Sequence, residues 1–211
     1  MATQEAPRME TVKDVETLER LYGVPVRQSV FKEVDHLHPA YRPFIERSPF
    51  MVLATSGPGG LDASPRGDPA GFVAIEDAHT LLLPDRRGNN RIDSLRNILA
   101  DPRVALLFFV PGVNETLRVN GRASIVIEPA LLERFIYEGK PPRSVLRITV
   151  ESVYFQCGRA LIRSGLWDAT RQIARAELPS TGAILEALSQ GTFDGDAYDR
   201  ELPGRVKTTL Y

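Results

Sequence analysis

Residues 81–99 constrain the fold more than any other stretch, because they join the end of a strand to the start of a helix. A short apolar run ends at Pro84, which is typical of a buried strand that reaches its end. The residues that follow predict an amphipathic helix, which Asp101-Pro102 should end. Four apolar residues recur at helical spacing, and we expect them to form its buried face: Ile92, Leu95, Ile98 and Leu99.

The turn between this strand and this helix carries three arginines, namely Arg86, Arg87 and Arg91. We expect Asn89 or Asn90 to cap the helix, with Asp93 in its first turn. A helix N-terminus attracts anions, and guanidinium groups bind phosphate oxygens bidentately. The turn therefore predicts a site for a phosphate monoester; a solvated basic turn is the alternative. The chain lacks the glycine patterns of nucleoside-triphosphate loops and dinucleotide folds at this place.

Composition excludes several classes of protein. The 211 residues have 26 basic and 27 acidic side chains, so no basic excess favours nucleic-acid binding. This length predicts one domain with extensions, or at most two domains. The single Cys157 fits a reducing compartment, and we expect it to be buried and structural. No apolar run approaches the roughly 18 residues of a membrane span, and the N-terminus is too polar for a secretory signal, so we expect a cytoplasmic protein.

Seven short segments with strand character alternate with turn residues, and few helices lie between them. This pattern favours a mainly β fold built on a barrel. Asn120-Gly121 lies inside one segment and is open to two interpretations, a hairpin turn or a glycine bulge in one long strand. The segments are residues 50–55, 61–64, 71–75, 80–83, 103–110, 117–127 and 144–155, and we expect residues 65–69 to interrupt the chain after the second.

The flanking regions predict mostly helices. We expect helices at residues 11–22 (ended by Gly23), 39–46, 129–137, 158–167 and 181–190, the last capped by Ser180 or Thr181. Residues 1–9 are expected to be unstructured, and residues 24–31 and 193–211 to be extended. His36 and His38 share a loop with Asp35, but no further ligand clusters with them, so we expect no metal site.

The order of these features resembles the flavin-mononucleotide-binding split-barrel family of pyridoxamine 5′-phosphate oxidase. The similar segments are residues 50–55, 63–68, 81–99, 117–123 and 157–164, which together span about residues 45–168. The resemblance implies a mainly β (α+β) fold, a six-stranded split β-barrel with peripheral helices. It also implies a helical and extended N-terminal extension at 1–48, an FMN-binding split-barrel domain at 49–168, and a helical and extended tail at 169–211.

The resemblance further implies a homodimer with FMN at the interface, and it favours the bulge interpretation of Asn120-Gly121. The residues implied to hold the phosphate are Arg86, Arg87, Asn89, Asn90 and Arg91. Those implied to run along the flavin ring are Ser64, Pro65, Arg66, Gly67 and Asp68. Leu83 and Pro84, at the end of the strand before the turn, are also implied to bind the cofactor. A tail segment of the partner subunit is implied to reach the flavin through Arg163, Ser164 and Trp167.

The resulting functional hypothesis is an FMN-dependent oxidoreductase that moves two electrons between a small organic substrate or NAD(P)H and an acceptor. The flavin carries the chemistry, and the sequence assigns no catalytic side chain. Residues 202–207 do not resemble the basic motifs with which pyridoxamine phosphate oxidases grip the vitamin's phosphate, so we do not expect that reaction. The alternatives are a non-catalytic flavin- or small-ligand-binding protein and a deazaflavin-using reductase.

Overall fold

The computed structural model describes residues 10–211, which divide into two units, residues 10–33 and residues 34–211. The prediction for residues 1–9 lies outside the described residues. In the first unit, α1 (Val15–Tyr22) ends at Gly23, whose φ of 74° is readily adopted by glycine, as predicted. Residues 24–31 were expected to be extended, but they include the short helix α2 (Arg27–Phe31). Its first turn is closed by two hydrogen bonds from Ser29 to the carbonyl of Val26.

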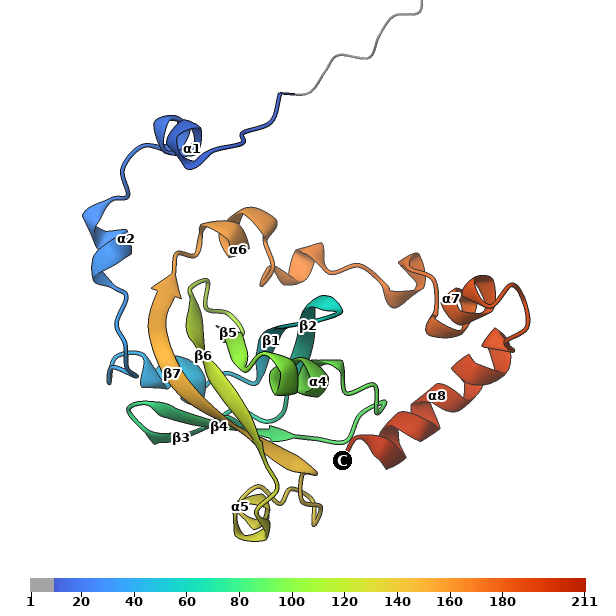
Figure 1. Cartoon of the computed structure of the whole chain (residues 1–211). Coiled ribbons are helices and arrows are strands. Elements are labelled where there is room, and N and C mark those ends of the chain that lie inside the picture. The colour runs from blue at the N-terminus through green and yellow to red at the C-terminus, as the bar shows by residue number, and fades with distance from the viewer. Residues whose placement is uncertain (1–9) are drawn as a thin grey trace, which may run out of the picture. The chain divides into compact units, whose positions relative to one another are not determined.

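The second unit is built on one antiparallel sheet with the strand order β2-β1-β5-β6-β7-β4-β3 (Figure 1). The predicted mainly β fold is confirmed, and the sheet is not closed, because β2 and β3 are both edge strands. The seven strands correspond to the seven predicted segments, one more than the six strands that the resemblance implies. The strands are β1 (Phe50–Gly57), β2 (Gly60–Gly67), β3 (Ala74–Asp77), β4 (Thr80–Asp85), β5 (Arg103–Phe109), β6 (Thr116–Val126) and β7 (Ser144–Gln156).

Along the strands, buried side chains alternate with more exposed ones, and the buried side chains form the hydrophobic core. In β1 the buried side chains are Met51, Leu53 and Thr55, while their neighbours are partly exposed. In α3 (Arg42–Glu46), Ile45 is fully buried, and the predicted inward residues Tyr41 and Phe44 pack partly buried against the same core. The division of the chain at residues 48 and 168 stays a prediction.

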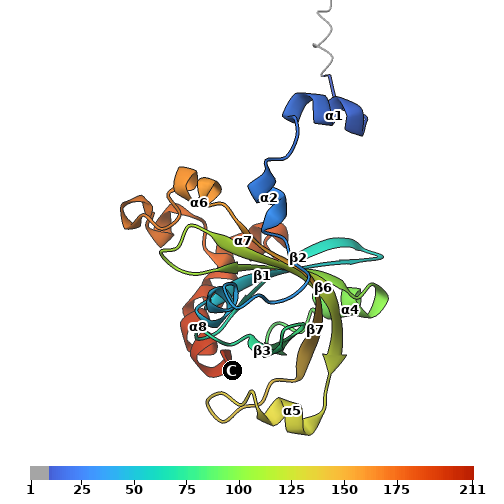
Figure 2. The ribbon, with the colours of Figure 1, turned by 90° about the vertical axis from the view of Figure 1, so that its left-hand side faces the viewer.

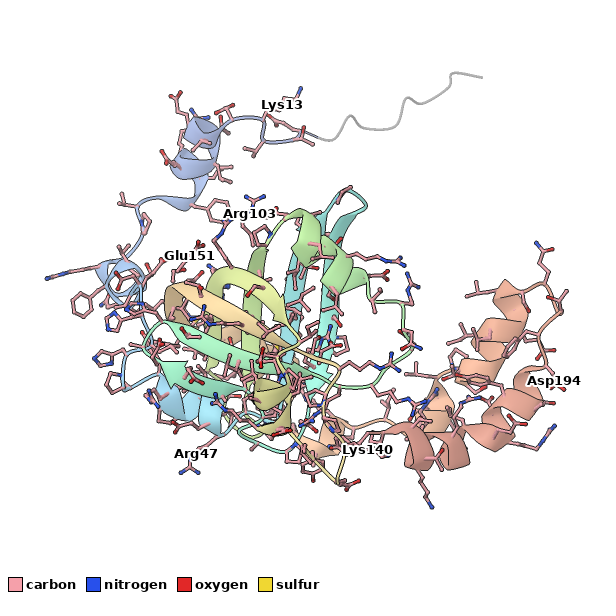
Figure 3. All side chains as sticks on the ribbon, turned by 60° about the horizontal axis from the view of Figure 1, so that its bottom comes forward. Lys13, Arg47, Arg103, Lys140, Glu151 and Asp194 are labelled. Carbon is pink, nitrogen blue, oxygen red and sulfur yellow. The ribbon has the colours of Figure 1, made fainter. Side chains whose placement is uncertain are left out.

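A bulge interrupts the pairing of β6 with β7. Asn120 pairs with Ser152 and Gly121 with Val150, so Glu151, labelled in Figure 3, has no partner on β6. The bulge interpretation is therefore confirmed and the hairpin excluded. A Cβ atom on Gly121 would overlap the carbonyl oxygen of Thr149 and lie 3.3 Å from the Cα of Val150. Glycine is required here because the two backbones approach too closely for a side chain.

The helix α4 (Asp93–Ala100) packs against β1 and differs in two respects from the prediction. Its N-cap is Ile92, with a φ of 54° and no side-chain cap, so the expected asparagine cap is wrong. Ile98 is buried and Leu95 is partly buried, as predicted, but Ile92 and Leu99 are exposed. Only a narrow stripe of this eight-residue helix contacts the sheet. The predicted end at Asp101 is confirmed.

β2 continues through Pro65, Arg66 and Gly67, so the expected interruption at residues 65–69 is wrong. Proline lacks an N–H, but an edge strand pairs on one side only and tolerates it. Cys157, expected to be buried, is exposed at the end of β7. The prediction rested on the lack of a neighbouring base or second thiol, and neither determines burial, because burial at a strand end depends on what covers that end.

The remaining helices lie in the β6–β7 connection and after β7 (Figure 2). They are α5 (Pro129–Glu133), α6 (Arg159–Ser164), two 3₁₀ turns (Ala169–Arg171 and Arg175–Glu177), α7 (Thr181–Leu188) and α8 (Gly195–Thr209). Ser180 caps α7 as predicted, accepting a hydrogen bond from the N–H of Ala183. Within residues 10–211, no helix is both long and apolar enough to span a membrane.

Residues 193–211 were expected to be extended, but most of them form α8. Asp194 caps this helix, and Pro203 lies inside it. Packing against α7 stabilises it, because Asp199 accepts a hydrogen bond from the N–H of Gly182 at 2.8 Å. Proline and glycine both disfavour the interior of a helix, and this tertiary contact overrides that local preference at Pro203 and Gly204.

Candidate functional site

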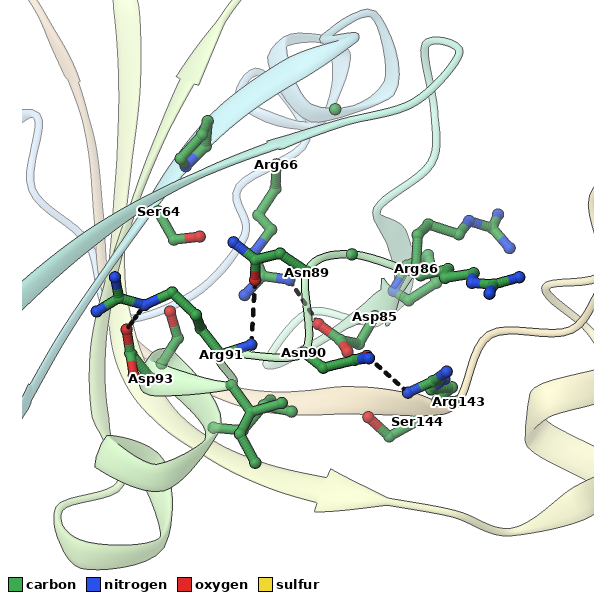
Figure 4. Close-up of a pocket in the computed structure, with 18 of the residues that line it drawn as sticks. Ser64, Arg66, Asp85, Arg86, Asn89, Asn90, Arg91, Asp93, Arg143 and Ser144 are labelled. Carbon is green, nitrogen blue, oxygen red and sulfur yellow. Dashed lines mark hydrogen bonds and ion pairs between the residues drawn. The ribbon is translucent and has the colours of Figure 1, made fainter. Parts of the chain in front are cut away.

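A pocket of about 550 Å³ opens where the strand-to-helix turn meets the edge strand β2 (Figure 4). Most of its lining comes from four segments: β2, the end of β4 with the turn into α4, the first residues of α4, and the start of β7 with the residue before it. Ten predicted site residues line it: Ser64, Pro65, Arg66, Gly67, Pro84, Arg86, Arg87, Asn89, Asn90 and Arg91. The antiparallel pairing of β4 with β7 places Asp85 opposite Ser144 and so brings the start of β7 to this turn.

Five predicted residues do not line the pocket. Leu83 belongs to the hydrophobic core, and the side chain of Asp68 is 2% exposed behind Arg86. The other three lie on α6 and just after it, where Trp167 donates a hydrogen bond to the carbonyl of Val113 at 2.8 Å. These three residues are Arg163, Ser164 and Trp167. They were expected to reach the cofactor of the partner subunit, and this stays a prediction.

Two of the predicted cations are held by mostly buried carboxylates. Arg66 forms an ion pair with Asp85 at 2.5 Å, and both side chains are mostly buried. Arg86 donates through Nε to Asp68 and through Nη1 to the carbonyl of Phe135, each at 2.6 Å. The Nε of Arg66 is buried and has no hydrogen-bond partner within residues 10–211. Such an orphaned donor is costly unless a ligand accepts its hydrogen bond.

Other cations at the turn are freer to bind an anion. Arg87 is exposed and makes no ion pair or hydrogen bond in the described part of the chain. Arg143 donates through its side chain only to the neutral amide of Asn90, at 2.9 Å, as Figure 4 shows. Arg91 forms an ion pair with Asp93 at 2.8 Å on the surface. Arg87 and Arg143 are therefore the cations that lack a carboxylate partner.

Sequence reasoning missed Arg143 although it precedes a predicted strand, because only the pairing of β7 with β4 carries it to the turn. It also missed three acidic groups in the lining, Asp62, Asp85 and Asp93. With five arginines and these three aspartates, the pocket carries an excess of two positive charges. Apolar atoms complete the lining from Phe72, Ile92, Leu95 and Leu210. A planar organic molecule with a doubly charged anionic group would match this lining.

Neither a metal cluster nor a histidine base is found at this place. Within the described residues, no group of three or more His, Cys, Asp or Glu side chains could hold a metal ion. The chain's three histidines, His36, His38 and His79, gather away from the pocket, with ring centroids 6.1 and 6.2 Å apart for the two neighbouring pairs. The titratable side chains that line the pocket are arginines and aspartates.

Comparison with known proteins identifies the family. The family model described as pyridoxamine 5′-phosphate oxidase matches residues 37–157, which is more than half of the chain and includes all seven strands. A comparison with curated proteins found no match. Similar solved structures include HupZ from Group A Streptococcus, with 18% identity and a TM-score of 0.46, covering 56% of this chain and 92% of that chain.

General Stress Protein 26 from Bacillus anthracis is similar at 17% identity and a TM-score of 0.41, covering 54% of this chain and 88% of that chain. An FAD-binding protein from Mesorhizobium loti is similar at 17% identity and a TM-score of 0.40, covering 58% and 97%. The predicted resemblance is confirmed by the family match, since that match includes the strands and the turn that form the pocket. The chain belongs to the pyridoxamine 5′-phosphate oxidase family.

Proposed function

We propose that this chain is an FMN-dependent oxidoreductase that transfers two electrons between a small organic substrate or NAD(P)H and an acceptor. The observation that carries the proposal is the cationic pocket: Arg87 and Arg143, neither paired with a carboxylate, stand at a strand-to-helix turn within the family match. Its volume of about 550 Å³ lies in the usual range for small-molecule sites, roughly 300–1,000 Å³.

The lining fits both ends of FMN. The phosphate monoester would be held by Arg87 and Arg143, because guanidinium forks bind phosphate oxygens bidentately. The ring system would lie along β2, where the orphaned Nε of Arg66 offers a hydrogen-bond donor. Bound flavin supplies the two-electron chemistry. The ion pair with Asp85 would keep Arg66 in place.

Removing either free arginine tests the phosphate assignment. A charge-assisted hydrogen bond contributes roughly 1.5–3 kcal/mol, and about 1.4 kcal/mol corresponds to a tenfold change in Kd. We therefore expect Arg87→Ala and Arg143→Ala each to weaken FMN binding at least about tenfold, measured by quenching of flavin fluorescence. Arg122→Ala, an exposed arginine on β6, is the matched control. Equal affinities in all three variants would place the phosphate elsewhere.

We also propose a homodimer with the cofactor at the interface, in which Arg163, Ser164 and Trp167 reach the partner's pocket. Analytical ultracentrifugation tests the dimer. In a dimer, Arg163→Ala should weaken FMN binding although Arg163 does not line the pocket of its own chain. A monomeric flavin-loaded protein would contradict this arrangement.

A non-catalytic flavin-binding protein is a second candidate, favoured by one observation. Of the three aspartates in the lining, Asp85 and Asp93 are held in ion pairs and Asp62 accepts a hydrogen bond from Ser94, so none stands ready as a proton carrier. Anaerobic reduction of the bound FMN by NADH or NADPH separates the two candidates, since a mere binder would be reduced no faster than free FMN. The third possibility is a deazaflavin-using reductase, and measuring whether the protein binds a deazaflavin in place of FMN tests it.

A further inference from the structure

We infer that Tyr211, which follows α8, is a positioning residue of the proposed cofactor pocket and acts through Asp68 on Arg86. The inference rests on the proposed function. Tyr211 lies outside residues 37–157, so the family match does not include it. Figure 1 shows the end of α8 beside the turn that leaves β4.

The carboxylate of Asp68 is buried, since its side chain is only 2% exposed. One of its oxygens accepts a hydrogen bond from Nε of Arg86 at 2.6 Å, and the other accepts one from the hydroxyl of Tyr211 at 2.7 Å. A buried carboxylate is costly unless its oxygens are satisfied. Tyr211 therefore satisfies the second carboxylate oxygen of Asp68, whose first oxygen is paired with Arg86.

The side chain of Arg86 is held in one orientation by contacts on several sides. Asp68 holds its Nε, the carbonyl of Phe135 holds its Nη1, and the rings of Tyr137 and Tyr211 each lie 5.9 Å from its guanidinium carbon. Its Nη2 has no hydrogen-bond partner among residues 10–211. Since Arg86 lines the pocket, the two Nη2 protons are available to an anionic ligand there.

Tyr211 is itself held in place by contacts with Lys140 and Tyr137. Its carbonyl accepts a hydrogen bond from Nζ of Lys140 at 2.7 Å, and Figure 3 shows Lys140 on the side toward α8. Its ring centroid lies 4.6 Å from that of Tyr137. The preceding residue, Leu210, lines the pocket. Leu210 thus forms part of the pocket wall, and Tyr211 holds Arg86 in place beside it.

Tyr211 acts as a hydrogen-bond donor rather than as a base. The hydrogen bond to the Asp68 carboxylate raises the pKa of Tyr211 to about 12. The phenol therefore stays protonated at neutral pH and continues to donate to Asp68.

Tyr211→Phe tests the inference, because it keeps the ring and removes only the donor. We expect the Kd for FMN to rise about tenfold, the size of effect that one lost hydrogen bond to a charged group produces. The visible circular dichroism of the bound flavin should also change, since Arg86 would lose its fixed orientation. The matched control is Tyr198→Phe in α8, whose ring packs on Arg205 at 4.1 Å and does not line the pocket.

A double-mutant cycle with Asp68→Asn separates positioning from general destabilisation. If Tyr211 acts through Asp68, adding Tyr211→Phe to Asp68→Asn should change the affinity little further. Affinity in Tyr211→Phe equal to that in Tyr198→Phe would overturn the inference, and so would fully additive losses in the cycle. Failure of the wild-type protein to bind FMN would instead refute the proposed function.

Discussion

The close approach of β6 and β7 at Gly121 predicts that Gly121→Ala destabilises the fold. The new Cβ would overlap the carbonyl oxygen of Thr149 and lie 3.1 Å from the carbonyl carbon. These are backbone atoms in a paired strand, so they cannot move aside without separating β6 from β7 at the bulge. Overpacking of this kind costs about 1–3 kcal/mol, and we expect the upper end because no flexible side chain can absorb it.

The same substitution also restricts the unfolded chain, which offsets the loss by about 0.4–1 kcal/mol. The expected net loss is about 2 kcal/mol in the free energy of unfolding, which lowers Tm by roughly 4–8 °C in a chain of this size. Urea and thermal unfolding measure both quantities. Gly59→Ala is the matched control, because nothing lies within 4 Å of its new Cβ. A Gly121→Ala protein as stable as the control would refute the close approach.

Two further predictions use the same measurements. Ile98→Ala, which removes a side chain 3% exposed between α4 and the sheet, should cost about 2–5 kcal/mol. Leu99→Ala, at 78% exposure, should stay within about 0.5 kcal/mol, and similar losses in both would contradict the assigned face. The pKa of Tyr211, raised from 10.0 to about 12, adds stability that is complete below pH 10 and is lost as the pH rises toward 12. The urea midpoint of the wild type should therefore fall more steeply across that range than that of Tyr211→Phe, and parallel curves would argue against the Tyr211–Asp68 hydrogen bond.

Local patterns predicted most strands of this fold well. Apolar alternation located β1, β5, β6 and β7 to within a few residues, because one face of each lies against the core. Two of the predictions that failed concern segments whose structure depends on distant contacts. α8 contains Pro203-Gly204 and forms because it packs on α7, and β2 tolerates Pro65 because it is an edge strand.

The residues of the candidate site also fall into those that the sequence reveals and those that only the structure reveals. The turn at residues 86–91 could be recognised from sequence, because its arginines and glycine follow each other directly. Arg143 and Tyr211 could not, since they reach the turn only through the pairing of β7 with β4 and the course of α8.

By itself, the sequence determined the mainly β fold and the cationic turn, because strand alternation and neighbouring charges are local properties of the chain. Only the tertiary structure decided which arginines remain free. Asp68 and Asp85 neutralise Arg86 and Arg66 from 18 and 19 residues away, and this pairing leaves Arg87 and Arg143 without a carboxylate partner. The reason is that an ion pair depends on distance in space, which sequence separation does not set.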